Sequence, residues 1–280
     1  MAFPSIESEG AKSRTIEADG LSTHYIEKGS GPPLVLVHGG GAGADAWGNW
    51  RACIGLYAER FRVIAVDMPG FGRSAKPSPD SYEYSQANRN RHLAAFIGAL
   101  GAGPVGLIGN SMGGATALGV VMARPDLVSR LVLMGSAGLD IANPDQEVRK
   151  SLTGYDFTIE AMEAIVRTLT GPDYVMDPDL LRYRYQLTLD AASRAAIAGL
   201  RGKPLTYERA AIAKVKTPTL VVGGKDDRIA ILARTYGFLE LLENSWGFIL
   251  PHCGHWVMME APAAFVAVTT TFLEAFGEAK

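Results

Sequence analysis

The stretch GPVGLIGNSMGGATALGVV, residues 103–121, decides the fold that the rest of the chain has to fit. Its apolar run at 104–109 predicts a buried strand, and the small apolar residues at its end predict a helix. Between them, GNSMG (109–113) matches G-x-S-x-G, the pattern of a tight strand-to-helix turn that lifts a serine oxygen above a sheet. Small flanking residues are needed because such a turn is strained. This context favours a nucleophilic Ser111 over a chance match in a glycine-rich loop.

Five further apolar runs, rich in β-branched residues, predict strands, and helix-length segments separate most of them. They are LVLV (34–37), RVIAV (62–66), RLVLM (130–134), TLVVGG (219–224) and WGFIL (246–250). This alternation indicates an α/β fold with a mostly parallel sheet covered on both faces, which binds ligands at the carboxyl ends of its strands. Two weaker runs, SRTIEA (13–18) and LSTHYIEKG (21–29), predict an antiparallel hairpin ahead of the sheet.

The alternation of strands and helices stops between about Gly138 and Arg209. Segments such as TIEAMEAIVRTLT (158–170) show the periodicity of amphipathic helices there, and we find no convincing strand. A solenoid would show a repeated sequence period, which is absent. We therefore expect a helical cap of residues 139–208, inserted after the sixth strand into an α/β core of residues 1–138 and 209–280.

A serine nucleophile requires a base and an orienting acid, which in this strand order follow it as acid and then histidine. The strand at 219–224 runs into GKDDR and offers Asp226 and Asp227, of which Asp227 is favoured by the turn spacing from Gly224. The strand at 246–250 runs into PHCGHW and offers His252 and His255, of which His255 is favoured because it lies at the tip of the loop. Strand-end loops place these groups at one edge of the sheet. His24 and His92 lie away from that edge, and we expect them to pack or face solvent.

The glycine loop HGGGAG (38–43) permits two interpretations. With the residue after it, the loop fits the G-x-G-x-x-A turn of a dinucleotide site, and Asp67 could imitate the acid that binds a ribose. Three features count against that interpretation: His38 lies between strand and glycines, tryptophans replace an immediate small-residue helix, and the Ser-Asp-His set would be unexplained. The loop instead suits an oxyanion hole, with the N–H groups of Gly40 and Met112 as donors.

The composition excludes several classes of function. The 280 residues suffice for one large domain with an insert, and a formal charge of −2 gives no bias towards nucleic acid or anionic lipid. Cys53 and Cys253 lack metal-ligand spacing and indicate free thiols in a reducing compartment. We find no signal-peptide pattern and no apolar run of membrane-spanning length. We therefore expect a cytoplasmic protein without a metal site, a nucleic-acid partner or a membrane partner.

The chain resembles the α/β-hydrolase superfamily over nearly its whole length, and within it the meta-cleavage-product hydrolases of bacterial aromatic degradation. The motifs that carry the resemblance are HGGGAG, GNW, DMPGFGRS, GNSMGGATALG, LVLMGSAGL, GKDDR and SWGFILPHCGHW. The last motif and GNSMGGATALG are most similar to the branch acting on biaryl-derived compounds, such as those of carbazole, dioxin and dibenzofuran. The resemblance implies cofactor-free hydrolysis of a carbon–carbon bond in a 2-hydroxy-6-oxo-6-arylhexa-2,4-dienoate, to 2-hydroxypenta-2,4-dienoate and an aromatic acid. It also implies a homo-oligomer, a dimer or larger.

The resemblance further implies a set of substrate-binding residues, which are Gly41, Asn49, Asn110, Arg184 and Trp256. In this scheme the two asparagines contact the polar end of the dienoate and Arg184 pairs with its carboxylate, because a guanidinium suits a bidentate acceptor. By sequence alone, the neighbouring Arg182 competes equally with Arg184.

The chain departs from the family's pattern in one place, since GKDDRIAIL lacks the Val-Pro pair that often follows the acid. Two other functions stay open: a carboxylesterase or thioesterase with the same triad, and a non-catalytic receptor for a small molecule.

Overall fold

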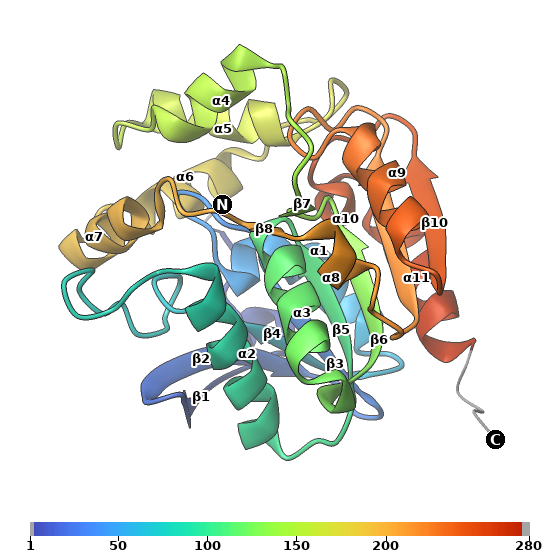
Figure 1. The fold of residues 1–280 in the computed structure, drawn as a ribbon. Coiled ribbons are helices and arrows are strands. Elements are labelled where there is room, and N and C mark those ends of the chain that lie inside the picture. The colour runs from blue at the N-terminus through green and yellow to red at the C-terminus, as the bar shows by residue number, and fades with distance from the viewer. Residues whose placement is uncertain (1–2, 276–280) are drawn as a thin grey trace.

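The computed structural model describes residues 3–275, so residues 1–2 and 276–280 of the predicted core lie outside it. Its centre is an eight-stranded sheet with the order β1-β2-β4-β3-β5-β6-β9-β10 (Figure 1). The strands are β1 (Lys12–Ala18), β2 (Leu21–Lys28), β3 (Pro33–Val37), β4 (Arg62–Val66), β5 (Val105–Asn110), β6 (Val128–Met134), β9 (Thr219–Gly224) and β10 (Ser245–Leu250). β1 and β2 form an antiparallel hairpin, β2 runs antiparallel to β4, and the remaining neighbours are parallel. The predicted hairpin and mostly parallel sheet are confirmed.

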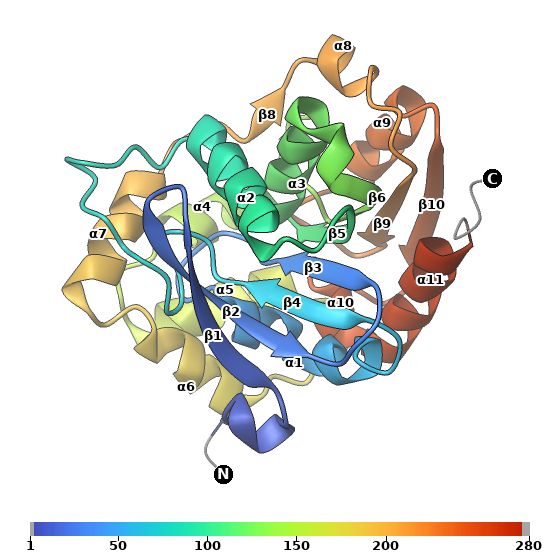
Figure 2. The ribbon, with the colours of Figure 1, turned by 90° about the horizontal axis from the view of Figure 1, so that it is seen from below.

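Helices cover both faces of the sheet, as the apolar strands predict. The main layers are formed by α1 (Ala46–Tyr57), α2 (Gln86–Leu100), α3 (Met112–Ala123), α9 (Leu232–Leu241) and α11 (Pro262–Glu274). Helices α1 and α11 pack on one face and α2, α3 and α9 on the other (Figure 2). Successive residues of β3 alternate between the two layers: Leu36 packs with α1 and α11, whereas Val35 and Val37 pack with α2 and α3. A central strand of this sheet therefore needs apolar residues at every position.

Four helices follow β6 in the chain and lie over the edge of the sheet where the parallel strands end (Figure 1). They are α4 (Gln146–Thr153), α5 (Ile159–Leu169), α6 (Pro178–Gln186) and α7 (Ala191–Leu200). Helix α5 buries Met162, Ile165 and Val166 on one face, in keeping with the predicted amphipathic pattern. The division into core and cap at the stated boundaries stays a prediction. No helix within residues 3–275 is long and apolar enough to cross a membrane.

A second, two-stranded sheet joins the two ends of this helical segment. β7 (Gly138–Leu139) and β8 (Thr206–Tyr207) pair in parallel. The expectation of no strand between Gly138 and Arg209 is wrong at these four residues, because a strand of two residues is too short to carry a periodic pattern. Short elements complete the chain: the 3₁₀ turns Glu7–Glu9 and Pro125–Leu127, α8 (Arg209–Ile212) and α10 (Val257–Glu260).

The turn from β5 into α3 is unusually close to the end of β3. Ser111 sits at its apex with φ +53°, a conformation that side chains rarely adopt. A Cβ at Gly109 would overlap the carbonyl oxygen of Gly113, and a Cβ at Gly113 would lie 2.5 Å from the carbonyl oxygens of Val37 and His38. Glycine is therefore needed at both positions of G-x-S-x-G, because neighbouring backbone atoms on both sides of the serine leave no room for a side chain.

We predict that Gly113→Ala lowers the free energy of unfolding by about 1–3 kcal/mol, because its methyl group meets backbone atoms that cannot move aside. Gly98→Ala is the matched control, since Gly98 lies in α2 with nothing within 4 Å of its would-be Cβ. Alanine there should raise the stability by about 0.5–1 kcal/mol. Urea unfolding followed by tryptophan fluorescence measures both, and equal changes would contradict the steric explanation.

Candidate active site

The two strand-end loops predicted to supply the base and the acid meet at one point. His255 Nδ1 lies 2.8 Å from Asp227 Oδ2, and both side chains are buried. The other oxygen, Oδ1, accepts the N–H groups of Ile229 at 2.7 Å and Ala230 at 2.8 Å. The neighbouring Asp226 is exposed, and its backbone N–H donates to the Cys253 carbonyl at 2.9 Å. Asp227, and not Asp226, is thus placed to orient the histidine.

The protonation of this pair follows from its surroundings. Burial raises the pKa of Asp227, but the charge of His255, its hydrogen bond and the two backbone N–H donors outweigh burial and hold that pKa below its ordinary value. An ionised carboxylate can only accept hydrogen bonds, so Nδ1 of His255 is the donor. In the neutral imidazole, Nε2 then carries the lone pair with which a base takes a proton.

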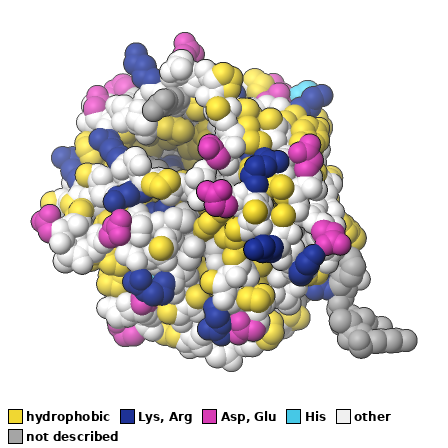
Figure 3. Space-filling model, in the orientation of Figure 1, with side chains coloured by type: hydrophobic (Ala, Val, Ile, Leu, Met, Phe, Trp, Pro, Cys, Tyr) yellow, Lys and Arg dark blue, Asp and Glu magenta, His cyan; other side chains and the backbone are white. Residues whose placement is uncertain are grey.

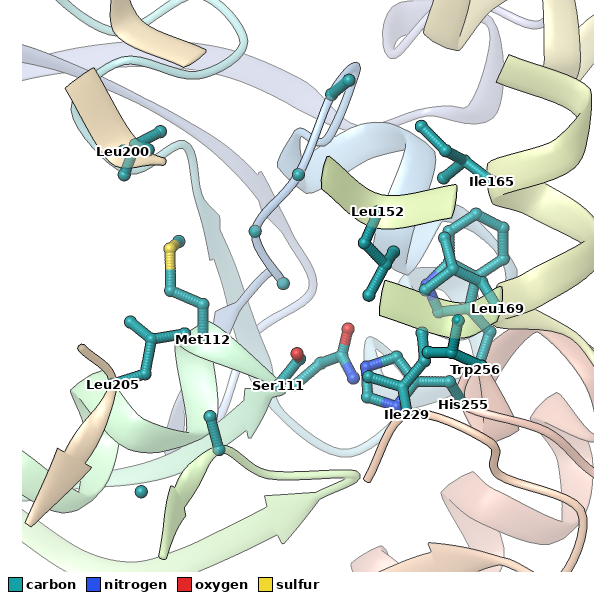
Figure 4. A pocket seen from close by; sticks show the side chains of 18 of the residues that line it. Ser111, Met112, Leu152, Ile165, Leu169, Leu200, Leu205, Ile229, His255 and Trp256 are labelled. Atoms are coloured by element: carbon teal, nitrogen blue, oxygen red, sulfur yellow. The ribbon is translucent and has the colours of Figure 1, made fainter. Parts of the chain in front are cut away.

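Ser111 and His255 line the same cavity (Figure 4). Among the described residues no hydrogen bond joins their two side chains. The serine is held by its backbone: its N–H donates to the Met134 carbonyl at 3.1 Å, and its carbonyl accepts the Ala137 N–H at 3.0 Å.

The histidine loop is fastened to the end of α5. The N–H of His255 donates to the Leu169 carbonyl at 2.9 Å. Glu260 accepts the N–H of Gly254 at 3.0 Å and that of Gly171 at 2.7 Å, so one carboxylate bridges the two loops. This role of Glu260 does not follow from the sequence pattern. Its only signal was an acidic residue in the otherwise apolar segment WVMMEAP.

The glycine loop lies directly against the start of α3. A Cβ at Gly40 would lie 3.1 Å from Met112 Sδ, so the loop backbone and the first turn of α3 face each other. Gly41 has φ +101°, which favours glycine. His38 Nδ1 lies 2.6 Å from the Gly39 carbonyl oxygen, while its Nε2 accepts the N–H of Met68 at 3.0 Å. The Gly39–Gly40 peptide carries the Gly40 N–H, and His38 holds this peptide in place through its carbonyl oxygen.

Asp67 is fully engaged in the structure around this loop. Its carboxylate accepts the N–H groups of Ala46 at 2.7 Å and Arg73 at 2.8 Å, and lies 2.8 Å from His24 Nδ1. Its side chain is 2% exposed, so it is not open to a ribose hydroxyl. This arrangement agrees with the interpretation of Asp67 as part of a strand-end turn and not of a dinucleotide site.

Asn49 and Asn110 are brought together although they lie on different elements. Asn49 Nδ2 donates to Asn110 Oδ1 at 3.2 Å, and Asn110 Nδ2 donates to the Met134 carbonyl at 3.2 Å. Both asparagines are buried and line the cavity. They form one polar cluster beside the serine turn.

Arg184 lies in the same cavity with most of its hydrogen-bonding capacity unused. Its side chain is buried, and its Cζ lies 4.8 Å from the centroid of the Trp256 ring. Its Nη2 donates to the Ala42 carbonyl at 3.0 Å. Nε and Nη1 have no partner within residues 3–275. Burial lowers the pKa of Arg184 to about 10, which leaves it charged at neutral pH. Arg182, its competitor by sequence, is exposed and paired with Asp179.

The cavity has a volume of about 480 Å³. Beyond the residues already named, its walls are mainly apolar, and the larger apolar side chains include Phe71, Leu152, Ile165, Leu169, Leu200, Leu205 and Ile229. Three further cationic side chains also line it, those of Arg89, Lys203 and Arg234. Figure 4 places Met112, Leu200 and Leu205 on one side of Ser111 and Leu152, Leu169 and Trp256 on the other. Figure 3 shows hydrophobic side chains gathered in a hollow beneath α4. In the described chain, no group of three or more histidine, cysteine or acidic side chains could hold a metal ion.

Comparisons with known proteins agree with this site. The sequence model of the alpha/beta hydrolase family matches residues 34–268. The chain is 46% identical over 266 residues to 2-hydroxy-6-oxo-6-(2'-aminophenyl)hexa-2,4-dienoic acid hydrolase of Metapseudomonas resinovorans, covering 93% of this chain and 90% of that protein. It is 32% identical to 2-hydroxy-6-oxo-2,4-heptadienoate hydrolase of Pseudomonas putida F1, covering 94% and 96%.

The crystal structure of a serine hydrolase involved in carbazole degradation superposes with a TM-score of 0.87 and 44% identity, covering 95% of this chain and 99% of that one. A family model that spans most of the chain, together with relatives of this identity and coverage, leaves no ambiguity of family. The chain belongs to the alpha/beta hydrolase family and, within it, to the meta-cleavage-product hydrolases.

Proposed function

We propose that this protein hydrolyses a carbon–carbon bond in 2-hydroxy-6-oxo-6-arylhexa-2,4-dienoates, giving 2-hydroxypenta-2,4-dienoate and an aromatic acid. The observation that carries the proposal is the combination of Ser111 and the His255–Asp227 pair with the buried Arg184 in one cavity. A serine hydrolase of neutral esters has no need of a buried cation with two unpartnered nitrogens. The names of the relatives support the same reaction: one is a hydrolase of a 6-(2'-aminophenyl) dienoate and the other a hydrolase of a 2-hydroxy-6-oxo-dienoate without an aryl group.

The reaction begins at the polar end of the substrate. The dienol is converted to its keto form, which makes the departing carbon fragment a stabilised enol. Arg184 pairs with the substrate carboxylate, and Asn49 and Asn110 contact the neighbouring oxygen functions. The guanidinium nitrogens left without protein partners are suited to a bidentate carboxylate. The apolar side chains from the helical segment surround the aryl group.

Ser111 Oγ then attacks the C6 ketone while His255 Nε2 takes its proton, and Asp227 stabilises the imidazolium that forms. The N–H groups of Gly40 and Met112 hold the oxyanion, a contribution of about a hundredfold or more in rate for one such donor. The C5–C6 bond breaks, and its electron pair is delocalised through the conjugated carbons onto the C2 oxygen, which takes the proton from the His255 imidazolium to give 2-hydroxypenta-2,4-dienoate. Water hydrolyses the remaining acyl-serine and releases the aromatic acid. The chemistry uses no metal or cofactor. The homo-oligomeric state and the cytoplasmic location expected from the sequence stay predictions.

We predict that the protein bleaches the yellow 2-hydroxy-6-oxo-6-phenylhexa-2,4-dienoate, measured as loss of the dienolate absorbance. Ser111→Ala should lower kcat by about 10⁴-fold or more while still binding the substrate, because only the nucleophile is removed. Preserved colour with rapid cleavage of p-nitrophenyl esters would favour an esterase. Binding without turnover of either substrate would favour a receptor.

We predict that Arg184→Gln weakens kcat/KM for the carboxylated dienoate about 10- to 100-fold, the loss expected for hydrogen bonds to a charged group. A neutral p-nitrophenyl ester should be cleaved within about threefold of the wild-type rate, since it has no carboxylate to anchor. Arg182→Gln, on the same helix but exposed, is the matched control and should leave both substrates unaffected. Equal losses for both substrates in Arg184→Gln would make Arg184 a structural residue.

We predict that Asp227→Asn lowers kcat by about 10⁴-fold, because the amide cannot hold His255 Nδ1–H as a carboxylate does. Asp226→Asn is the matched control one residue earlier, and its exposed side chain should change kcat by less than about twofold. Steady-state kinetics of the two variants decide between the acids that the sequence left in competition. The reverse pattern would assign the role to Asp226.

A further inference from the structure

A hydrogen bond between distant parts of the sequence ties helix α6 to the segment that follows the glycine loop. The Tyr183 hydroxyl donates to Asp45 Oδ2. The other oxygen, Asp45 Oδ1, accepts the Gly48 N–H at 2.7 Å and caps the N-terminus of α1. Helix α6 lies beside α1 (Figure 2). One buried carboxylate therefore joins α6, the end of the glycine loop and the helix that carries Asn49.

The Asp45 carboxylate depends on these donors because it is out of contact with water. It is 3% exposed. Burial and the negative charge of Asp67 raise the pKa of Asp45 to about 7, although the hydrogen bonds from Tyr183 and Gly48 and the charge of Arg184 act in the opposite direction. A buried carboxylate that loses a donor is strongly destabilised. The Tyr183 hydroxyl is thus the hydrogen bond from α6 that favours the ionised form of Asp45.

The residue next to Tyr183 in the sequence is the predicted carboxylate anchor. The carbonyl of Arg184 packs so closely on Gly43 that a Cβ there would overlap it. The guanidinium of the same residue donates to the carbonyl of Ala42, which directly precedes Gly43 in the loop. The position of α6 on the glycine loop therefore sets where the guanidinium stands.

We propose that Asp45 and Tyr183 are positioning residues that hold α6 on the glycine loop and so place the Arg184 guanidinium for a substrate carboxylate. The inference rests on the proposed role of Arg184 and deepens it. Neither Asp45 nor Tyr183 is among the residues that line the cavity, so the pair acts on the substrate through residues that it positions, and for α6 that residue is Arg184.

Tyr183→Phe tests the proposal with little disturbance of packing. The Tyr183 ring is stacked on Phe3 with centroids 4.4 Å apart, so the phenylalanine ring keeps its neighbours and only the hydroxyl is lost. The probe is hexa-2,4-dienoate, a planar conjugated carboxylate with no ketone to be attacked, and calorimetry measures its Kd. We expect the Kd to rise about tenfold, the loss typical of one hydrogen bond to a charged group.

Kinetics provide a second readout that a merely structural defect would not give. For the aryl dienoate, KM should rise about tenfold in Tyr183→Phe, with kcat within about threefold of the wild type. For a neutral p-nitrophenyl ester, both constants should stay within about threefold. Asp45→Asn keeps an acceptor for the Gly48 N–H and removes the charge, so it should shift the Kd in the same direction by a smaller factor.

Tyr57→Phe is the matched control. Its hydroxyl is also buried but lies 2.6 Å from Thr269 Oγ1, between α1 and α11. It should leave the Kd unchanged. A double-mutant cycle then isolates the coupling: in the Arg184→Gln background, Tyr183→Phe should change the Kd by less than about twofold, because the group that it positions is gone.

Equal losses in Tyr183→Phe and Tyr57→Phe, or a full tenfold loss that persists in Arg184→Gln, would overturn the positioning role. The binding cycle needs no turnover. A wild-type protein that leaves the aryl dienoate uncleaved would therefore contradict the proposed function alone, and the cycle would still decide whether Asp45 and Tyr183 act through Arg184.

Discussion

The close approach of α3 to the end of β3 is the constraint on which the rest of the site depends. Gly113 leaves no room for a side chain between α3 and the carbonyls of Val37 and His38. This contact brings the glycine loop, which continues β3, against the first turn of α3, so the Gly40 and Met112 peptides face one region of the cavity. The strained turn at Ser111 costs on the order of 1–3 kcal/mol, which the apolar layers on both faces of the sheet offset.

The parts of the site that the sequence predicts are those governed by local pattern. Apolar runs predicted the eight main strands, and a parallel sheet brings strand-end loops to one edge, so Ser111, Asp227 and His255 could be assembled without coordinates. Turn spacing favoured Asp227 over Asp226, and in the structure the Asp227 carboxylate lies 2.8 Å from His255 Nδ1. The substrate-binding residues came from family resemblance and not from pattern, and their roles stay predictions.

The parts that the sequence does not predict depend on contacts between distant residues. Tyr183 and Asp45 are 138 positions apart and Gly171 and Glu260 are 89 apart, so no local periodicity relates them. The apolar wall of the cavity was missed for a similar reason. An amphipathic pattern predicts that Ile165 faces inward, but it does not say whether the side chain packs on the core or borders a cavity.

The parallel pair β7–β8 has a consequence for how this enzyme can diversify. Because Leu139 and Tyr207 are hydrogen-bonded neighbours in this pair, the chain leaves the sheet and returns to it at nearly the same point. The four residues of β7 and β8 close the segment between them, and they lie outside its helices. Adding residues to a closed segment of this length raises the entropic cost of closing it only slightly. Helices between those residues that make no contact with the glycine loop or the histidine loop can therefore be lengthened, shortened or exchanged without shifting the register of β6 and β9. Helix α6 is constrained, because it carries Arg184 and packs on Gly43. The choice of aryl group can thereby change in stretches of sequence that leave the catalytic residues and α6 in place.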